Sequence, residues 1–197
     1  MRAFFAVDLP DDLAPRVAKA QAAFEGAEGL RFVDPEQTHV TLKFLGEIDD
    51  TDDTAERDDN ETTPALDDVI AAGERAIETA GVDPFECAIR DYGVFPSLDY
   101  VSVVWAGIGR GTPELTALHE ALETQTTAIG VDPEDHEFTP HVTLARMNDA
   151  RGKEIVQEAV RERDPEVGRF DVDAVRLVSS TLTSDGPAYD TVASFGL

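Results

Sequence analysis

The chain has 197 residues, 42% of them hydrophobic, and its 41 acidic and 16 basic residues give a formal net charge of −25. This length predicts one domain or two small lobes, and the hydrophobic content is enough for a core, which excludes a disordered chain. No stretch approaches the roughly 18 apolar residues of a membrane span. The single cysteine, Cys87, excludes an internal disulfide and a cysteine-based zinc site. We expect a cytoplasmic protein without a membrane partner.

The acidic residues are spread along the whole chain. One interpretation is an acidic binding surface for a cationic partner. The even distribution favours adaptation to a salt-rich cytoplasm, because the Debye length falls to about 3 Å at 1 M salt and self-repulsion is then screened. The same screening weakens the usual argument that an acidic chain avoids nucleic acids.

The first third of the chain predicts a strand, a helix and a second strand. Residues 2–9 form an apolar run typical of a buried strand, and residues 10–26 predict a helix. A turn at Pro35 precedes a strand over 39–45. Residues 49–63 are almost wholly polar and mostly acidic, which indicates a solvated surface insertion and not a functional acidic tail.

The later elements continue this alternation. We predict helices over 64–81, from Thr112 onwards and over 151–163, and strands over 84–97, 100–108, from His141 onwards, 170–180 and 189–197. This order predicts an α+β fold with antiparallel or mixed sheets, not a doubly wound parallel sheet. We expect residues 1–197 to form a single domain of two similar lobes, each a sheet backed by helices.

The tetrapeptide His-Val-Thr-Leu occurs at 39–42 and again at 141–144, in a chain with four histidines. Because side chains alternate along a strand, each copy presents its histidine and threonine on one face and its valine and leucine on the other. The same alternation places Lys43 on the first His-Thr face. It places Arg146 on the aliphatic side, unless the second strand ends, twists or bulges there.

Placed side by side, the two strands would form a site for phosphoryl chemistry. His39 and His141 would flank one space, with the hydroxyls of Thr41 and Thr143 beside them. Imidazole titrates near neutral pH, so one ring can act as base and the other as acid, while hydroxyls donate hydrogen bonds to anionic oxygens. This set suits in-line displacement at the phosphorus of a phosphodiester, and the scheme requires no metal or cofactor.

The two motifs with their flanks, THVTLKFLGE and FTPHVTLAR, resemble those of the two-histidine (2H) phosphoesterase superfamily. The nearest branch is the RNA 2',3'-cyclic phosphodiesterase family, historically called 2'-5' RNA ligase. The likeness extends to the opening RAFFAVDLP, to FPS and VVWAGI in the middle, and to the C-terminal LVSSTLTSDGPAYDTVASFGL. It implies a bilobal α+β fold of two sheets with the active site in the groove between them.

The resemblance implies that His39 is the proton donor to the leaving oxygen and that His141 is the acceptor that activates water. It implies that Thr41, Thr143 and Arg146 bind the substrate phosphate. The implied reaction opens the 2',3'-cyclic phosphate at an RNA end, such as that of a tRNA half, or in a small cyclic nucleotide, to a 2'-phosphate. The reverse reaction would join such an end to a 5'-hydroxyl. Together with the charge, the resemblance suggests a monomer from a halophilic archaeon.

Expectations for five further side chains follow from their places in the sequence. Lys43 is a candidate for contact with substrate phosphate or a solvated rim residue. Phe95 is a candidate for the floor of a base pocket or part of a plain hairpin turn. We expect Trp105 in the core, and we expect no functional role for His119 and His136.

Two other function classes remain open. One is a metal-dependent phosphoesterase in which His39, His141 and a third ligand such as His136 hold an ion, although zinc sites usually contain closer histidine pairs than any in this sequence. The other is a non-catalytic protein that binds RNA ends or nucleotides, although binding alone requires cations and stacking and not two titrating imidazoles.

Overall fold

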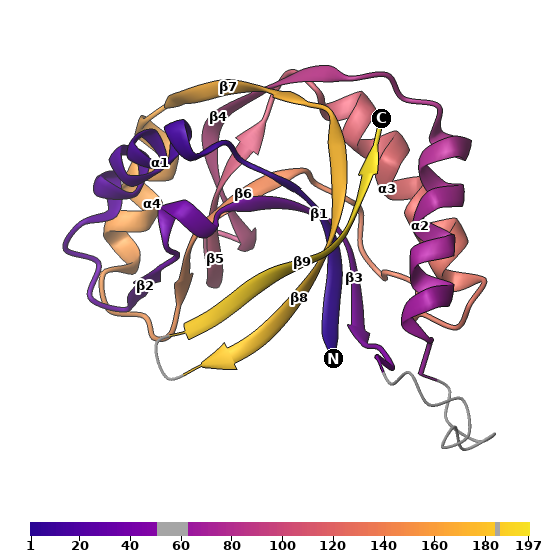
Figure 1. Ribbon diagram of the computed structural model, residues 1–197. Coiled ribbons are helices and arrows are strands. Elements are labelled where there is room, and N and C mark those ends of the chain that lie inside the picture. Colours follow the sequence, from indigo (N-terminus) through magenta and orange to yellow (C-terminus); the bar gives the residue numbers. More distant parts are fainter. Residues whose placement is uncertain (51–62, 184–185) are drawn as a thin grey trace.

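Nine strands and four helices follow one another along the described residues, 1–50, 63–183 and 186–197, of the computed structural model (Figure 1). The strands are β1 (Arg2–Asp8), β2 (Leu30–Phe32), β3 (His39–Glu47), β4 (Phe85–Pro96), β5 (Val101–Ile108), β6 (His141–Met147), β7 (Glu166–Val172), β8 (Ala174–Thr183) and β9 (Gly186–Gly196). The helices are α1 (Ala14–Gln21), α2 (Leu66–Ala80), α3 (Thr112–Thr127) and α4 (Lys153–Glu162). Of the predicted acidic insertion at 49–63, residues 51–62 lie outside the described residues.

The strands form one curled sheet in the order β7-β4-β5-β6-β3-β1-β8-β9, with β2 paired to β6. Every pair between these named strands is antiparallel. The α+β prediction is confirmed. The two expected sheets are the two halves of this single sheet, because β3 and β6 pair with each other at Val40 and Val142.

One of the predicted strands is divided between two strands of the structure. The expected strand over 170–180 is the end of β7 followed by β8, with a break at Asp173. β7 lies beside β4 at one edge of the sheet, whereas β8 lies beside β1 in the other half. The chain arches over the top of the molecule between the two halves (Figure 1). Local sequence could not reveal the break, because the residues on both sides of Asp173 keep the alternation of a strand.

The helices cover the outer side of the sheet and leave its inner side open. Helices α1 and α4 pack on the half that contains β4 and β6, and α2 and α3 pack on the half that contains β3 and β9 (Figure 1). The apolar residues that predicted the first helix are all buried: Leu13, Val17, Ala20 and Phe24. Each fully buried leucine, valine or phenylalanine side chain contributes about 1.5–3 kcal/mol. On the inner side, the described residues form a small separate cluster of buried side chains around Phe4 and Val178.

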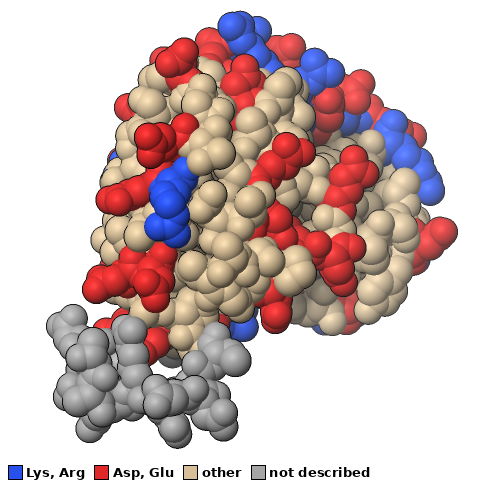
Figure 2. Space-filling model, turned by 90° about the vertical axis from the view of Figure 1, so that its right-hand side faces the viewer, with Lys and Arg blue, Asp and Glu red and all other residues tan. Residues whose placement is uncertain are grey.

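The surface is acidic where it can be seen over α2 and α3. Figure 2 shows acidic side chains scattered over that face among uncharged ones, with few basic side chains. None of the helices in the described part of the chain is long and apolar enough to cross a membrane.

We expect the melting temperature to rise with KCl, because screening relieves the repulsion that a net charge of −25 creates in the folded state. Between about 0.1 M and 1 M salt the Debye length falls from about 10 Å to about 3 Å. Thermal unfolding followed by circular dichroism over this range should show a rise of several degrees, since about 1 kcal/mol corresponds to roughly 2–4 °C at this chain length. Sorbitol at equal osmolality, which does not screen charge, is the control. A constant or falling melting temperature in KCl would contradict the expectation.

Candidate active site

The two tetrapeptides begin neighbouring strands at the centre of the sheet. β3 starts at His39 and β6 starts at His141, and the strands meet antiparallel at Val40 and Val142. The valine and leucine side chains of both copies are buried, and the histidine and threonine side chains are only partly buried. The predicted alternation therefore holds through both tetrapeptides.

The first strand contains a bulge at Leu42. Two consecutive residues of β1 pair with Lys43 and Thr41, which leaves Leu42 without a partner. A bulge reverses the alternation of side chains beyond it. As a result Lys43 turns to the buried outer face, and Phe44, which is 59% exposed, turns to the face of the first histidine and threonine.

The second strand contains the same bulge, at Leu144. Two consecutive residues of β5 pair with Ala145 and Thr143, so that Leu144 is the extra residue. Ala145 is buried and Arg146 is exposed, on the His-Thr face. Strict alternation would place Arg146 on the aliphatic side of the strand. The bulge at Leu144 turns it to the His-Thr face instead.

At each bulge, the carbonyl of the extra residue accepts a hydrogen bond from a buried side chain of a helix. The carbonyl oxygen of Leu42 accepts a hydrogen bond from Nδ1–H of His119 on α3 at 2.7 Å. The carbonyl oxygen of Leu144 accepts one from Nε2–H of Gln21 on α1 at 3.0 Å. The Leu144 carbonyl accepts a second hydrogen bond, from the backbone N–H of Val33 at 3.0 Å. A buried carbonyl left unpaired would cost about 1–3 kcal/mol. His119, for which no functional role is expected, thus has a structural one. Gln21 carries no signal in the sequence, because its partner is far away along the chain.

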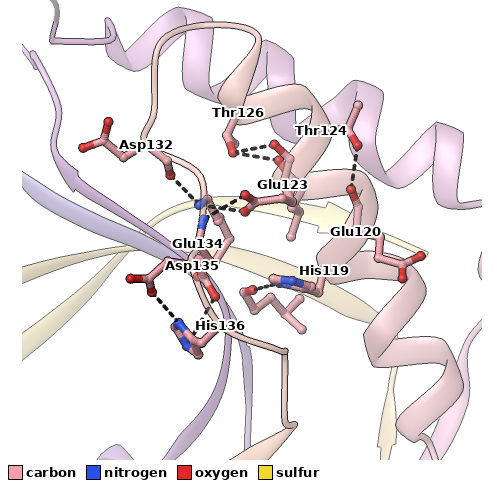
Figure 3. Close-up of polar contacts among 12 residues, drawn as sticks. His119, Glu120, Glu123, Thr124, Thr126, Asp132, Glu134, Asp135 and His136 are labelled. Atoms are coloured by element: carbon pink, nitrogen blue, oxygen red, sulfur yellow. Dashed lines mark hydrogen bonds and ion pairs between the residues drawn. The ribbon is translucent and has the colours of Figure 1, made fainter.

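The expectation that Lys43 shares the His-Thr face is also wrong. Its side chain is 1% exposed, and its Nζ lies 2.7 Å from Oε2 of Glu123 and donates to the carbonyl oxygen of Asp132 at 2.9 Å. Oε1 of Glu123 accepts from the backbone N–H of Glu134. Burial alone would raise the pKa of Glu123, but these hydrogen bonds and the charge of Lys43 lower it. Figure 3 shows Glu123 of α3 meeting the 132–136 loop at this cluster, so Lys43 fastens that loop and is no candidate for substrate contact.

The two motif histidines are oriented in the same way. Nδ1–H of His39 donates to the carbonyl oxygen of Gln37 at 3.0 Å, and Nδ1–H of His141 donates to that of Thr139 at 2.6 Å. These bonds assign the proton of each neutral ring to Nδ1. Nε2 of each ring is therefore the atom left to accept or donate a proton.

Aromatic side chains enclose both imidazoles. The ring of His39 stacks on Phe4 with centroids 4.9 Å apart and meets the edge of Tyr189 at 5.2 Å. The ring of His141 lies 5.0 Å from Phe95 and 5.9 Å from Trp105. Phe95, a sequence candidate, thus lies beside a motif histidine.

Trp105 is not in the core as expected but on the inner face of the sheet. It pairs with Thr143 across β5 and β6, and directly paired residues point to the same side. Gly93 on β4 leaves the necessary room, because a Cβ atom there would come within 2.1 Å of the indole ring. Gly93 is the signal in the sequence that could have placed Trp105 on this face. It can be used only once the register of β4 against β5 is known.

Burial is the largest cause of a lowered pKa at both His39 and His141. The charge of Arg146 lowers both values further, and His39 and His136 add to the lowering at His141. Asp8, which pairs directly with His39 across β1 and β3, acts in the opposite direction and raises the pKa of His39. The two imidazoles and the guanidinium thus lie close enough to interact electrostatically, with an acidic neighbour at His39 and a basic one at His141.

Hollows adjoin both histidines. One of about 60 Å³ is lined by residues of both motif strands, of β4 and of the 134–139 loop, among them Thr41, Phe44, Phe95, His136 and His141. Another, of about 220 Å³, lies next to His39 between Asp8, Gln37 and Tyr189. The hydroxyls of Thr41 and Thr143 make no hydrogen bond within the described residues, so both are available to a ligand.

Other kinds of catalytic centre are not apparent in the described part of the chain. No group of three or more His, Cys, Asp or Glu side chains is placed there to hold a metal ion. Cys87 is buried, and burial, assisted by Glu114, raises the pKa of its thiol to about 12, so the thiol is not an activated nucleophile.

The sequence model of the 2'-5' RNA ligase superfamily matches residues 9–183. This chain belongs to that superfamily. A superfamily relative from Methanothermobacter thermautotrophicus, named RNA 2',3'-cyclic phosphodiesterase, is 34% identical over 200 residues, which cover 100% of this chain and 99% of the relative. Another relative with that name, from Aeropyrum pernix, is 35% identical over 164 residues, 83% of this chain and 84% of the relative.

Solved structures agree with this assignment. The crystal structure of TT0787 from Thermus thermophilus superposes with a TM-score of 0.73 at 29% identity, over 100% of this chain and 98% of that one. E. coli LigT, solved with 3'-AMP, superposes with a TM-score of 0.74 over 100% and 97% of the two chains, and at 23% identity it supports the superfamily fold alone.

Proposed function

We propose that this protein is an enzyme that hydrolyses the 2',3'-cyclic phosphate at RNA ends to a 2'-phosphate without a metal ion. The observation that carries the proposal is the matched pair of imidazoles on β3 and β6, each with Nδ1 bound to a backbone carbonyl and Nε2 left for proton transfer. Relatives that are named for this activity and align over most of their length support the substrate class. The proposal includes tRNA halves and small cyclic nucleotides as substrates, reversible 2'-5' ligation, and a cytoplasmic monomer as the working form.

In the proposed reaction, water attacks phosphorus and the bond to the 3'-oxygen breaks. Nε2 of His141 takes the proton of the water, and Nε2–H of His39 gives a proton to the departing 3'-oxygen. Hydroxyls of Thr41 and Thr143 donate to the non-bridging oxygens, and the Arg146 guanidinium balances the charge that develops on them. Proton exchange with solvent then restores both rings.

The surrounding charges support this division of roles. Asp8 favours the protonated form of His39, as a proton donor requires. His39 and His136 favour the neutral form of His141, as a proton acceptor requires. Arg146 lowers the pKa of both rings and does not distinguish them. The two tetrapeptides are identical, so the difference arises from neighbours that the fold brings to them.

The proposal is tested with purified protein, a nucleoside 2',3'-cyclic phosphate and excess chelator, followed by phosphorus NMR of the product. A 2'-phosphate formed at the same rate with and without chelator supports it. Activity that disappears with chelator and returns with a divalent ion would support the metal-dependent alternative. Tight binding of the cyclic phosphate without turnover would support the non-catalytic alternative.

Two substitutions, each of which changes the pKa of one motif histidine, should show which histidine is the acid and which is the base. Asp8→Asn removes the charge that raises the pKa of His39, and His136→Gln removes one that lowers the pKa of His141. If His39 is the acid, Asp8→Asn should move only the alkaline limb of the kcat/KM profile, towards lower pH. If His141 is the base, His136→Gln should move only the acidic limb, towards higher pH. Movement of the opposite limb in each variant would reverse the assignment.

A further inference from the structure

A second arginine faces the same side of the sheet as Arg146. β2 pairs antiparallel with the end of β6, and Arg31 stands directly opposite Arg146 in that pairing. Directly opposed residues of antiparallel strands point to the same face. Both residues are exposed, so two arginines stand opposite each other beyond Thr143 on the face that carries the motif side chains.

Neither of these two cations has an acidic partner among residues 1–50, 63–183 and 186–197. In a chain with 41 acidic residues, neither Arg31 nor Arg146 forms an ion pair within the described residues. The nearby acids Glu28 and Asp149 contact Arg151 instead, at 3.5 Å and 2.9 Å. Like charges directly opposite each other destabilise a sheet. Two arginines with no acidic partner in the part of the chain that the structure describes suit an anion supplied by a ligand.

The spacing places this pair next to the reacting centre. With Leu144 in the bulge, Arg146 is two strand steps from Thr143, about 7 Å along the strand. Arg31 lies one strand further out, with its Cβ about 5 Å from that of Arg146. It also lies against the start of β9, because a Cβ atom at Gly186 would be 2.9 Å from its Nη2. An RNA strand carries one phosphate per nucleotide, so a neighbouring phosphate would come within reach of Arg31.

We propose that Arg31, beside Arg146, binds the phosphodiester that links the terminal nucleotide of the substrate to the nucleotide before it. The planar guanidinium fork matches two phosphate oxygens. The inference rests on the proposed function and deepens it: the enzyme distinguishes RNA ends of two or more nucleotides from cyclic mononucleotides, which lack this phosphate.

The test compares a nucleoside 2',3'-cyclic phosphate with a dinucleotide that ends in the same group, at one KCl concentration. Arg31→Gln should raise KM for the dinucleotide about tenfold, leave its kcat unchanged, and leave both constants for the mononucleotide unchanged. Arg31→Lys should give a smaller rise, because lysine keeps the charge without the fork. Arg161→Gln removes another exposed arginine, on α4 at the outer side of the sheet, and is the matched control.

Equal effects on both substrates, or none, overturn the inference. An effect confined to the 5'-hydroxyl strand in ligation also overturns it, because the phosphate would then belong to the second RNA. Binding of a dinucleotide ending in a 2'-phosphate, compared with the corresponding mononucleotide, provides a readout without turnover. If the unaltered protein binds both but hydrolyses neither cyclic substrate, the proposed function fails, while selective loss of dinucleotide binding in Arg31→Gln still supports the subsite.

Discussion

Replacing either motif histidine by alanine is expected to lower kcat for cyclic phosphate hydrolysis by roughly 10²–10⁴-fold, the range typical of a lost general acid or base. His39→Ala removes the proton that the leaving 3'-oxygen needs, and His141→Ala removes the acceptor for the proton of water. KM should change less than kcat, because Thr41, Thr143 and Arg146 remain to hold the phosphate. Steady-state kinetics at a fixed pH provide the measurement.

The kcat of the double variant should be only slightly below that of the less active single variant, because groups that act in one step have strongly non-additive effects. Both histidines lie on the inner face, so the melting temperature of each variant should stay close to that of the unaltered protein. His119→Ala is the useful contrast, because it should lower the melting temperature by leaving the carbonyl of Leu42 unpaired. Near-normal turnover in both motif variants would mean that the chemistry lies elsewhere.

Arg146→Gln should have the second largest effect and should act in two ways. Loss of a charged hydrogen-bond donor to phosphate, about 1.5–3 kcal/mol, corresponds to a fall in kcat/KM of roughly 10–100-fold. Loss of its positive charge should also raise the pKa of both histidines, since that charge lowers them. The whole kcat/KM profile should therefore move to higher pH. A variant with normal kcat/KM and an unmoved profile would remove Arg146 from the site.

Much of this site could be predicted from the sequence because it depends on short-range patterns. Two identical tetrapeptides at strand starts determine which side chains share a face, and His39, Thr41, His141 and Thr143 all lie where alternation places them. The helices were equally accessible, because their apolar spacing is local. The break at Asp173 was not, because only pairing with distant strands separates β7 from β8.

The errors have one physical origin. A bulge at Leu42 turns Lys43 into the core and Phe44 out of it, and alternation alone cannot foresee an extra residue. The partners that stabilise the bulges lie on helices far away in the sequence, so Gln21 and His119 carry no local mark. Trp105 was misplaced for the same reason: its position depends on the register of β5 against β6 and on the space left by Gly93.

The pH dependence of kcat/KM for the unaltered protein tests the two-imidazole mechanism most directly. Burial lowers the pKa of both His39 and His141 from 6.5, so above neutral pH the free enzyme lacks its acid, and at low pH it lacks its base. We predict a bell-shaped profile with its maximum on the acidic side of pH 7, whose two apparent pKa values belong to the coupled pair. Bound phosphate should stabilise both imidazolium forms and displace the kcat profile to higher pH. A kcat/KM that is flat from about pH 5 to 8, or that rises steadily with pH as for attack by hydroxide, would contradict the mechanism.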